Sequence, residues 1–327
     1  MPHWKLSANL AFFGAQKNRF TQYQPGRDLE VRLDMASQID GLDGVELKYP
    51  ADFADVDLVG ELLEKYGFEL SAVNVGTKDA EHFRYGALSA ADDGARQKAI
   101  DRLCDGMDLA AELGAGLVTT CPLADAYDYP FQIDYTATWE RYIDTVRTVA
   151  EHRPDVRFCL EFQPHEPHAK VLLNNVGKML HVCAEVGLPN LGANFDVGHS
   201  FAAGESPAEA VALLASTNRL FYMHSNDNTG EGGDWDMISG SVHFWHWLEL
   251  LYTLERVGYE GWIGADITAK HFGPTEAFRA NTNMIRRMQN LLERMGTDRI
   301  AEMIAEEGKT PELYDYMISF IAPDVAD

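Results

Sequence analysis

Short apolar segments alternate with longer segments of helical periodicity along most of the 327-residue chain. Most of the short segments are apolar on both faces, which is typical of parallel strands that are buried between layers. The strands predicted in this way are 5–13, 44–49, 69–75, 116–121, 157–162, 191–197, 220–225 and 262–267. The pattern therefore predicts eight successive strand-then-helix units.

The longer segments repeat apolar residues every three or four positions, which predicts amphipathic helices. Clear examples are 95–114, 139–152 and 243–258. The pair Ser206-Pro207, followed by Glu209, is typical of a helix start. Glycines that follow such segments are typical of a C-terminal cap before the next strand. They are Gly67, Gly114, Gly187 and Gly258.

Eight strand-then-helix units predict an α/β protein with a (β/α)8 TIM barrel. An open, doubly wound sheet is the second alternative, but the chain has neither the GxGxxG nor the P-loop motif of its nucleotide-binding versions. We expect residues 1–295 to form the barrel. Helical patterns at 276–295 and 298–322 indicate that 296–327 is a C-terminal helical extension, packed on the barrel or on a partner subunit.

The chain has 51 acidic and 27 basic residues, which give a formal net charge of −24. This balance argues against nucleic acid or a membrane as partner, because nucleic acids and anionic membranes require basic patches. The N-terminus lacks the basic and apolar regions of a signal peptide, and no apolar run approaches the roughly 18 residues that cross a bilayer. We therefore expect a cytoplasmic protein.

The four cysteines are far apart in the sequence, so their spacing indicates neither a zinc cluster nor a disulfide framework. Cys121 and Cys159 lie in apolar stretches and are predicted to be buried thiols rather than reactive ones. This cysteine usage agrees with a reducing compartment.

Acidic and histidine side chains gather at the ends of the fifth to eighth predicted strands, where barrels of this kind have their active sites. A single Asp after a strand is most often a helix cap or a solvated loop residue. Several buried carboxylates at one mouth, however, repel one another unless a cation compensates them. Carboxylates with one or two imidazoles suit Mn²⁺ or Mg²⁺ better than a structural zinc. The residues are Glu161, Asp196, His199, His224, Asp234, Asp236 and Asp266.

The glycine-rich loop after the seventh strand allows a rival interpretation, an EF-hand that starts at Asp227. Its twelfth residue would have to be Glu, but Ile238 stands there, so this interpretation fails. We expect Asp227 to orient a ligand or to cap the turn. Trp235 is expected either to form a wall of the ligand site or to belong to the core. His243 and His246 are interpreted as helix-packing residues.

Four segments, LEFQPHEPH, NFDVGHS, HSNDNTGEGGDWDMI and WIGADI, resemble those of the xylose-isomerase-like (β/α)8 superfamily of sugar isomerases and epimerases. The resemblance covers about residues 5–295. It implies a first divalent metal bound by Glu161, Asp196, His224 and Asp266. It also implies a second metal bound by His199, Asp234 and Asp236, with Asp196 bridging the two.

The sequence departs from this family at two places. Sugar isomerases commonly carry a Lys two residues after the first metal-binding Glu, where this chain has Gln163. They also carry a catalytic His at the end of the second strand, where this chain offers Glu46, Lys48 and Asp52. These departures count against a simple aldose isomerase.

Further polar residues at the mouth are expected to act on a bound sugar. Lys48 and His165 are candidates for acid–base catalysis. Because side chains alternate in direction along a strand, we expect one of Glu46 and Lys48 to face the helix layer. The remaining candidates are predicted to contact the substrate; they are Gln163, Glu166, His168 and Trp235.

The resemblance implies proton transfer next to a carbonyl of a sugar or keto-sugar, as in isomerases and epimerases. Glu161 and Asp266 could act both as ligands of Mn²⁺ or Mg²⁺ and as bases. The alternative is β-elimination from a 3-oxo-glycoside, because the segments NLAFFG, YDYPFQ and MISGSVH resemble the large subunit of C-glycoside deglycosidases. That activity would imply a small second subunit, whereas the first implies a homo-oligomer. A non-catalytic sugar-binding barrel is the third interpretation.

Overall fold

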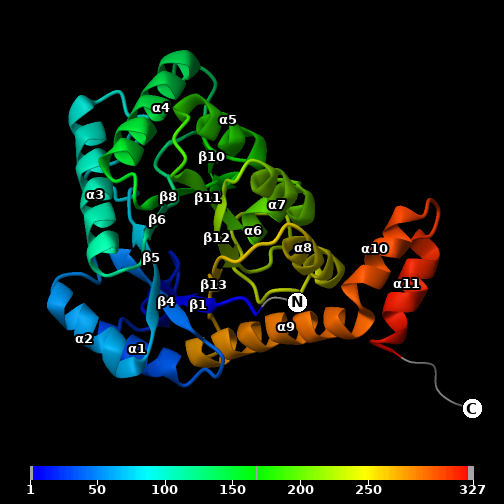
Figure 1. Ribbon diagram of the computed structural model, residues 1–327. Coiled ribbons are helices and arrows are strands. Elements are labelled where there is room, and N and C mark those ends of the chain that lie inside the picture. Colours follow the sequence, from blue (N-terminus) through cyan, green and yellow to red (C-terminus); the bar gives the residue numbers. More distant parts are fainter. Residues whose placement is uncertain (1–2, 167, 323–327) are drawn as a thin grey trace, which may run out of the picture.

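Eight parallel strands close into a barrel in the computed structural model, which describes residues 3–166 and 168–322 (Figure 1). The strand β1 pairs with both β4 and β13, so the sheet has no free edge and the open-sheet alternative is wrong. All eight strands coincide with predicted ones, which confirms the (β/α)8 fold. They are β1 (Leu6–Asn9), β4 (Gly44–Tyr49), β5 (Glu69–Val75), β6 (Leu117–Thr120), β8 (Arg157–Glu161), β11 (Leu191–Asp196), β12 (Leu220–Ser225) and β13 (Ile263–Ala265).

Helices surround this barrel (Figure 1). They are α1 (Leu29–Ser37), α2 (Val56–Tyr66), α3 (Asp93–Glu112), α4 (Tyr135–His152), α5 (Val176–Val186), α7 (Pro207–Ser216), α8 (Phe244–Arg256) and α9 (Pro274–Met295). The helix start at Ser206 and two of the four glycine caps are confirmed: the Ser206 side chain accepts from Glu209 N at the start of α7, and Gly67 and Gly187 end α2 and α5 with φ of 72° and 74°. Gly114 and Gly258 instead follow the C-cap residues of α3 and α8 by one position. Positive φ is the conformation that glycine adopts at least cost.

Short elements decorate the ends of the strands. They are η1 (Leu10–Phe13), the hairpin of β2 (Gln16–Lys17) and β3 (Gln22–Gln24), the small sheet of β7 (Ala126–Tyr127), β9 (His165–Glu166) and β10 (Ala169–Val171), and α6 (Val197–Ala202). The first strand is shorter than the predicted 5–13. It ends at Asn9 because the Asn9 side chain accepts a hydrogen bond from Ala11 N and starts the 3-10 turn of η1.

The hydroxyl of Tyr222 links three strands inside the barrel, below the mouth. Its hydroxyl is 3.0 Å from the Ser7 hydroxyl and 3.0 Å from the Ser71 hydroxyl, and all three residues are buried. A Cβ added at Gly264 would come within 2.6 Å of the same hydroxyl, so glycine is required there. The main apolar core lies between the strands and the helices and includes Phe158 and Trp247.

The C-terminal part continues from α9 into α10 (Thr297–Ala305) and α11 (Thr310–Ser319), which extend away from the barrel (Figure 1). Ile300 and Met303 of α10 are buried, whereas α11 buries none of its residues. Residues 323–327 of the expected extension lie outside the described residues, as does Pro167 of the LEFQPHEPH segment. Among the described residues, no helix is both long and apolar enough to cross a membrane.

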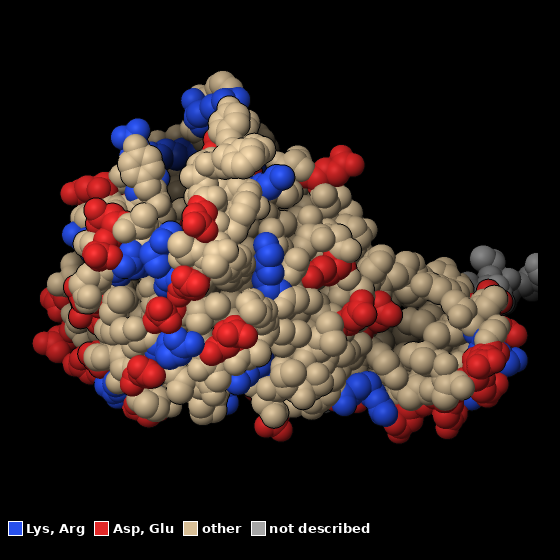
Figure 2. All heavy atoms as spheres, turned by 90° about the horizontal axis from the view of Figure 1, so that it is seen from above, with Lys and Arg blue, Asp and Glu red and all other residues tan. Residues whose placement is uncertain are grey.

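Acidic and basic side chains are interspersed over the face of the molecule drawn in Figure 2. Basic residues form no continuous patch on this face. The net charge of −24 is therefore not concentrated at one place on it.

We predict that Tyr222→Phe lowers the free energy of unfolding by about 1–3 kcal/mol, because the hydroxyls of Ser7 and Ser71 lose their shared buried partner. The midpoint and slope of urea denaturation measure this change. Tyr314→Phe is the matched control, because Tyr314 is 50% exposed on α11. Equal stability of both variants would contradict a structural role for the Tyr222 hydroxyl.

Candidate metal centre

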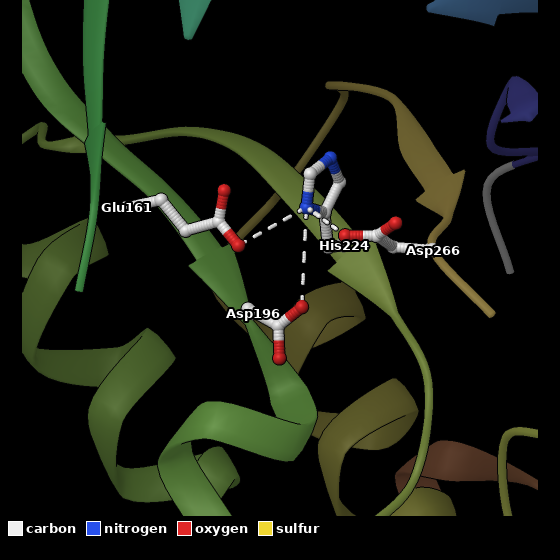
Figure 3. A group of neighbouring side chains, drawn as sticks. All are labelled: Glu161, Asp196, His224 and Asp266. Atoms are coloured by element: carbon white, nitrogen blue, oxygen red, sulfur yellow. Dashed lines mark hydrogen bonds and ion pairs between the residues drawn. The ribbon is translucent and has the colours of Figure 1, made fainter. Parts of the chain in front are cut away.

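Three carboxylates surround one nitrogen of His224 at the mouth of the barrel (Figure 3). The Nδ1 atom of His224 is 3.1 Å from Asp266 Oδ2, 3.3 Å from Glu161 Oε1 and 3.9 Å from Asp196 Oδ2. One ligand atom from each of the four residues lies within 4.8 Å of the others. The four side chains come from β8, β11, β12 and the position directly after β13, so barrel closure is what brings them together.

Asp196 lies at the junction of β11 and α6, where two hydrogen bonds hold its carboxylate. It is the last residue of β11 and the N-cap of α6, and its Oδ1 accepts a hydrogen bond from His199 N at 2.8 Å. Its other oxygen, Oδ2, accepts from the Asn226 amide at 2.8 Å. Both bonds restrict the rotation of the carboxylate. Asp196 therefore has a fixed orientation toward His224.

Glu46 holds the opposite side of the His224 ring. Its Oε2 lies 2.9 Å from His224 Nε2, and its Oε1 accepts from the Asn74 amide at 2.7 Å. When Nε2–H donates to Glu46, the lone pair of Nδ1 faces the three carboxylates. A carboxylate behind a metal-binding histidine is a common device that fixes the tautomer and the ring orientation. The interior of the barrel thus presents Nδ1 to the mouth.

The expectation that one of Glu46 and Lys48 faces the helix layer is wrong. Residues two positions apart on a strand point to the same side. Glu46 is buried against His224 inside the barrel, and the half-buried Lys48 interacts electrostatically with Asp266 at the mouth. Both side chains therefore belong to the site.

The electrostatics of the four residues favour a bound cation. Burial raises the pKa of Asp196 to about 7 and raises that of Asp266, although His224 and, for Asp196, His199 oppose the shift. Burial also acts to raise the pKa of Glu161, but the two histidines outweigh it and the net shift is downward. Converging carboxylate oxygens and one imidazole nitrogen form a donor set that suits Mn²⁺ or Mg²⁺. The residues present therefore fit the divalent metal that the sequence predicts.

The three residues predicted for a second metal lie beside this group but do not join it. His199 Nε2 is 3.1 Å from Asp234 Oδ2, and His199 Nδ1 is 3.4 Å from Glu161 Oε1. Asp236 instead accepts from the Thr268 hydroxyl at 3.0 Å. The second metal stays a prediction.

The LEFQPHEPH segment forms a short β-structure above the mouth. Gln163 is buried, and its amide nitrogen lies 3.2 Å from Glu166 Oε1. His165 and Glu166 form β9, which pairs with β10, and both are half-buried. His168 is exposed. Their roles in substrate binding and acid–base catalysis stay predictions.

Residues of the loop between β12 and α8 have two kinds of role: some stabilise the loop itself, and others lie at the mouth. Asp227 is buried and accepts from Val242 N and His243 N at 2.9 Å each, so it caps the turn that precedes α8. The His243 ring stacks on Phe201 with ring centroids 4.0 Å apart, in agreement with a packing role. Trp235 is 43% exposed, so its expected alternative as a core residue is wrong. A wall against a sugar ring stays its predicted role.

Cys104, Cys121, Cys159 and Cys183 form no disulfide with one another. Cys121 and Cys159 are buried, as predicted. Burial raises the pKa of both thiols well above the usual range, so both are protonated and unreactive at neutral pH.

The family model described as "Xylose isomerase-like TIM barrel" matches residues 33–288. The chain belongs to this family. A xylose isomerase from Thermus thermophilus is 27% identical to this xylose isomerase-like barrel over 204 residues, which are 61% of this chain and 53% of that protein. The barrel thus matches about half the length of that relative.

Solved structures of sugar epimerases are similar to this xylose isomerase-like barrel. A D-tagatose 3-epimerase-like protein has a TM-score of 0.66 at 17% identity, covering 89% of this chain and 98% of that chain. A 3-keto-D-glucoside 4-epimerase from E. coli has a TM-score of 0.66 at 15% identity, covering 87% and 99%. At these identities the likeness shows a shared fold.

Three residues of the site escaped the sequence analysis. Asn194 donates to Glu161 Oε2 at 3.1 Å, and Asn226 donates to Asp196. Both are polar residues within or next to a buried strand, a signal that points to the barrel interior. Lys78 follows β5 at the mouth; its only signal in the sequence is a basic residue just beyond a strand end.

We predict that Glu46→Gln weakens Mn²⁺ binding by about 10- to 100-fold, as is usual for loss of a carboxylate behind a metal-binding histidine. Glutamine has one oxygen for two donors, so one of its hydrogen bonds with His224 and Asn74 is lost. Calorimetric titration of Mn²⁺ measures the affinity.

The matched control is Glu69→Gln, because Glu69 begins the neighbouring strand β5 but pairs with Lys5 at the exposed end. It should bind Mn²⁺ as the unaltered protein does. If Glu46→Gln also keeps the original affinity, Glu46 does not position His224 for a metal.

Proposed function

We propose that this protein catalyses divalent-metal-dependent proton transfer at a carbon next to the carbonyl of a sugar or keto-sugar. The observation that carries the proposal is the convergence of Glu161, Asp196 and Asp266 on His224 Nδ1 within a barrel mouth. Membership of the xylose isomerase-like family supports it. So does the likeness in fold to proteins named as ketose and keto-glucoside epimerases.

Glu161, Asp196, His224 and Asp266 would hold Mn²⁺ or Mg²⁺, which supplies Lewis-acid stabilisation of negative charge on substrate oxygens. The rest of the chemistry belongs to the protein. When a base removes the proton, the electrons of the C–H bond form a C=C bond and the carbonyl π electrons move to oxygen. Mutagenesis of general bases usually changes rates by about 10²–10⁴-fold.

Glu161 and Asp266 are the proposed bases. They approach His224 from opposite sides, one from β8 and the other from the position after β13 (Figure 3). A substrate carbon between them would have a carboxylate on each face. Removal of a proton by one and delivery by the other inverts that carbon, which is epimerisation.

Lys48 is proposed as a proton carrier at the same mouth. Burial and the neighbouring charge of Lys78 lower the pKa of Lys48, although Asp52 and Asp266 oppose this shift. A lowered pKa makes the ammonium a better proton donor near neutral pH. His165 is a second proposed acid or base, and Trp235 a proposed wall for the sugar ring.

We expect the Mn²⁺-loaded protein to incorporate one deuterium into a substrate in D₂O. The panel consists of D-fructose, D-tagatose, D-psicose and 3-oxo-glucosides, and mass spectrometry detects the label. A labelled epimer or isomer identifies either of those reactions. Release of an aglycone identifies the β-elimination that the deglycosidase resemblance predicts.

Treatment with EDTA and the variant Asp196→Asn should each reduce the exchange by at least about 100-fold, because both remove the Lewis acid. Re-addition of Mn²⁺ should restore exchange to the EDTA-treated protein but not to the variant. The proposal is wrong if exchange in any active substrate proceeds equally without metal. It is also wrong if the metal-loaded protein labels none of the panel.

A further inference from the structure

Lys78 extends from a rigid backbone at the mouth of the barrel. It lies three residues beyond the end of β5. Just before it, Gly76 N donates to the Tyr49 carbonyl at 3.1 Å, and the hydroxyl of Thr77 is 3.1 Å from that of Thr120. The base of the Lys78 side chain is therefore fixed to the strands on both sides of β5.

The carboxylate of the next residue, Asp79, binds partners other than Lys78. Asp79 lies 2.7 Å from Arg102 Nη1 and 2.7 Å from His82 Nδ1. These two contacts lower the pKa of Asp79 to about 2, although its slight burial opposes the shift. Asp79 is thus engaged with other partners than Lys78.

The ammonium group of Lys78 interacts electrostatically with groups from many strand ends. A single charge can act on all of them only from within the mouth that they surround. Those groups lie on or directly after β4, β6, β8, β9 and β13, and in the loop after β12. They are Lys48, Cys121, Glu161, Glu166, Asp234 and Asp266.

Lys78 has no direct partner in the part of the chain that the structure describes. No carboxylate oxygen there lies within 4.0 Å of its ammonium, and no hydrogen bond involves that group. The exposed lysines Lys5 and Lys65, by contrast, pair with Glu69 and Glu30 at 2.6 and 2.5 Å. The side chain is exposed to solvent. Its three N–H groups are therefore available to a ligand.

The charge of Lys78 persists at neutral pH. Burial acts to lower its pKa, but the charges of Cys121, Glu161, Asp266 and Glu166 outweigh burial and raise it. Cys121 is a neutral thiol at this pH, so the carboxylates sustain the effect. Lys48 behaves in the opposite way, with a lowered pKa. The mouth therefore contains one permanent cation and one lysine that releases its proton more readily.

We propose that Lys78 binds the substrate oxygen that gains negative charge when the neighbouring carbon loses its proton. This inference rests on the proposed function. Besides compensating the carboxylates of the mouth, an ammonium without a direct partner has N–H groups that can hold an anion or a developing oxyanion. Preorganised donors of this kind stabilise a transition state more than the neutral carbonyl that precedes it.

The test uses two small probes and the Mn²⁺-loaded full-length protein. Glycolohydroxamate is a planar anion with the charge distribution of an enediolate, and glycolamide is its neutral counterpart. Lys78→Met should weaken glycolohydroxamate binding by about 10- to 100-fold, the usual effect of losing a charge-assisted hydrogen bond. Binding of glycolamide should change by less than about threefold. Lys78→Arg, which keeps the charge, should recover most of the affinity.

Lys98→Met is the matched control, because Lys98 is an exposed lysine on α3. It should bind both probes as the original protein does. The Mn²⁺ content by elemental analysis and the circular dichroism spectrum must be unchanged in Lys78→Met. This distinguishes loss of the Lys78 charge from loss of the metal site or of the fold. The inference is overturned if Lys78→Met affects neither probe, or both equally, or if the original protein does not bind the anion.

These measurements do not depend on turnover. If the original protein discriminates between the two probes through Lys78 but exchanges no proton in any sugar, the proposed function fails and the anion site remains. If it exchanges protons and Lys78→Met exchanges them equally fast, the inference about Lys78 is wrong and the proposed function remains.

Discussion

The repulsion among buried carboxylates is the constraint on which this site depends. Glu161, Asp196 and Asp266 approach one imidazole nitrogen at 3.1–3.9 Å in a mouth shielded from water. Left uncompensated, such charges shift toward protonation, as the pKa of about 7 for Asp196 indicates. The barrel can keep them together only because hydrogen-bond donors and cations are supplied from other strands. The positions of Asn194, Asn226 and Lys78 follow from that need.

Barrel closure makes this supply possible. The fifth to eighth strands provide the acidic group, whereas Glu46 and Lys78 come from the second and third strands. In an open sheet, β4 would lie far from β12, and the 2.9 Å contact between Glu46 and His224 could not form. The pairing of β1 with β13 and β4 therefore assembles the candidate site as well as closing the fold.

Much of this could be predicted from the sequence, because strands buried on both faces and residues at strand ends leave local signals. All eight strands, the capping residues of α7 and the set Glu161, Asp196, His224 and Asp266 were accessible in this way. Contacts across the barrel were not. The pairing of Glu46 with His224 joins residues 178 positions apart, and the hydrogen bonds from Val242 N and His243 N to Asp227 depend on how the loop folds back. In the sequence, Lys78 is simply a lysine that follows a strand. Only its surroundings in the fold distinguish it from an ordinary surface lysine.

The charges at the mouth can be understood as layers along the barrel. Tyr222 and His224 lie two positions apart on β12, point the same way and have ring centroids 5.6 Å apart. The neutral hydroxyls of Tyr222, Ser7 and Ser71 form one layer, and the carboxylate of Glu46 meets His224 in the next. Three carboxylates then face the other ring nitrogen, and the unpaired ammonium of Lys78 stands among their outer neighbours. The mouth therefore holds fixed charges of both signs. Under the proposed function, a sugar that enters it would need little reorganisation of these charges to react.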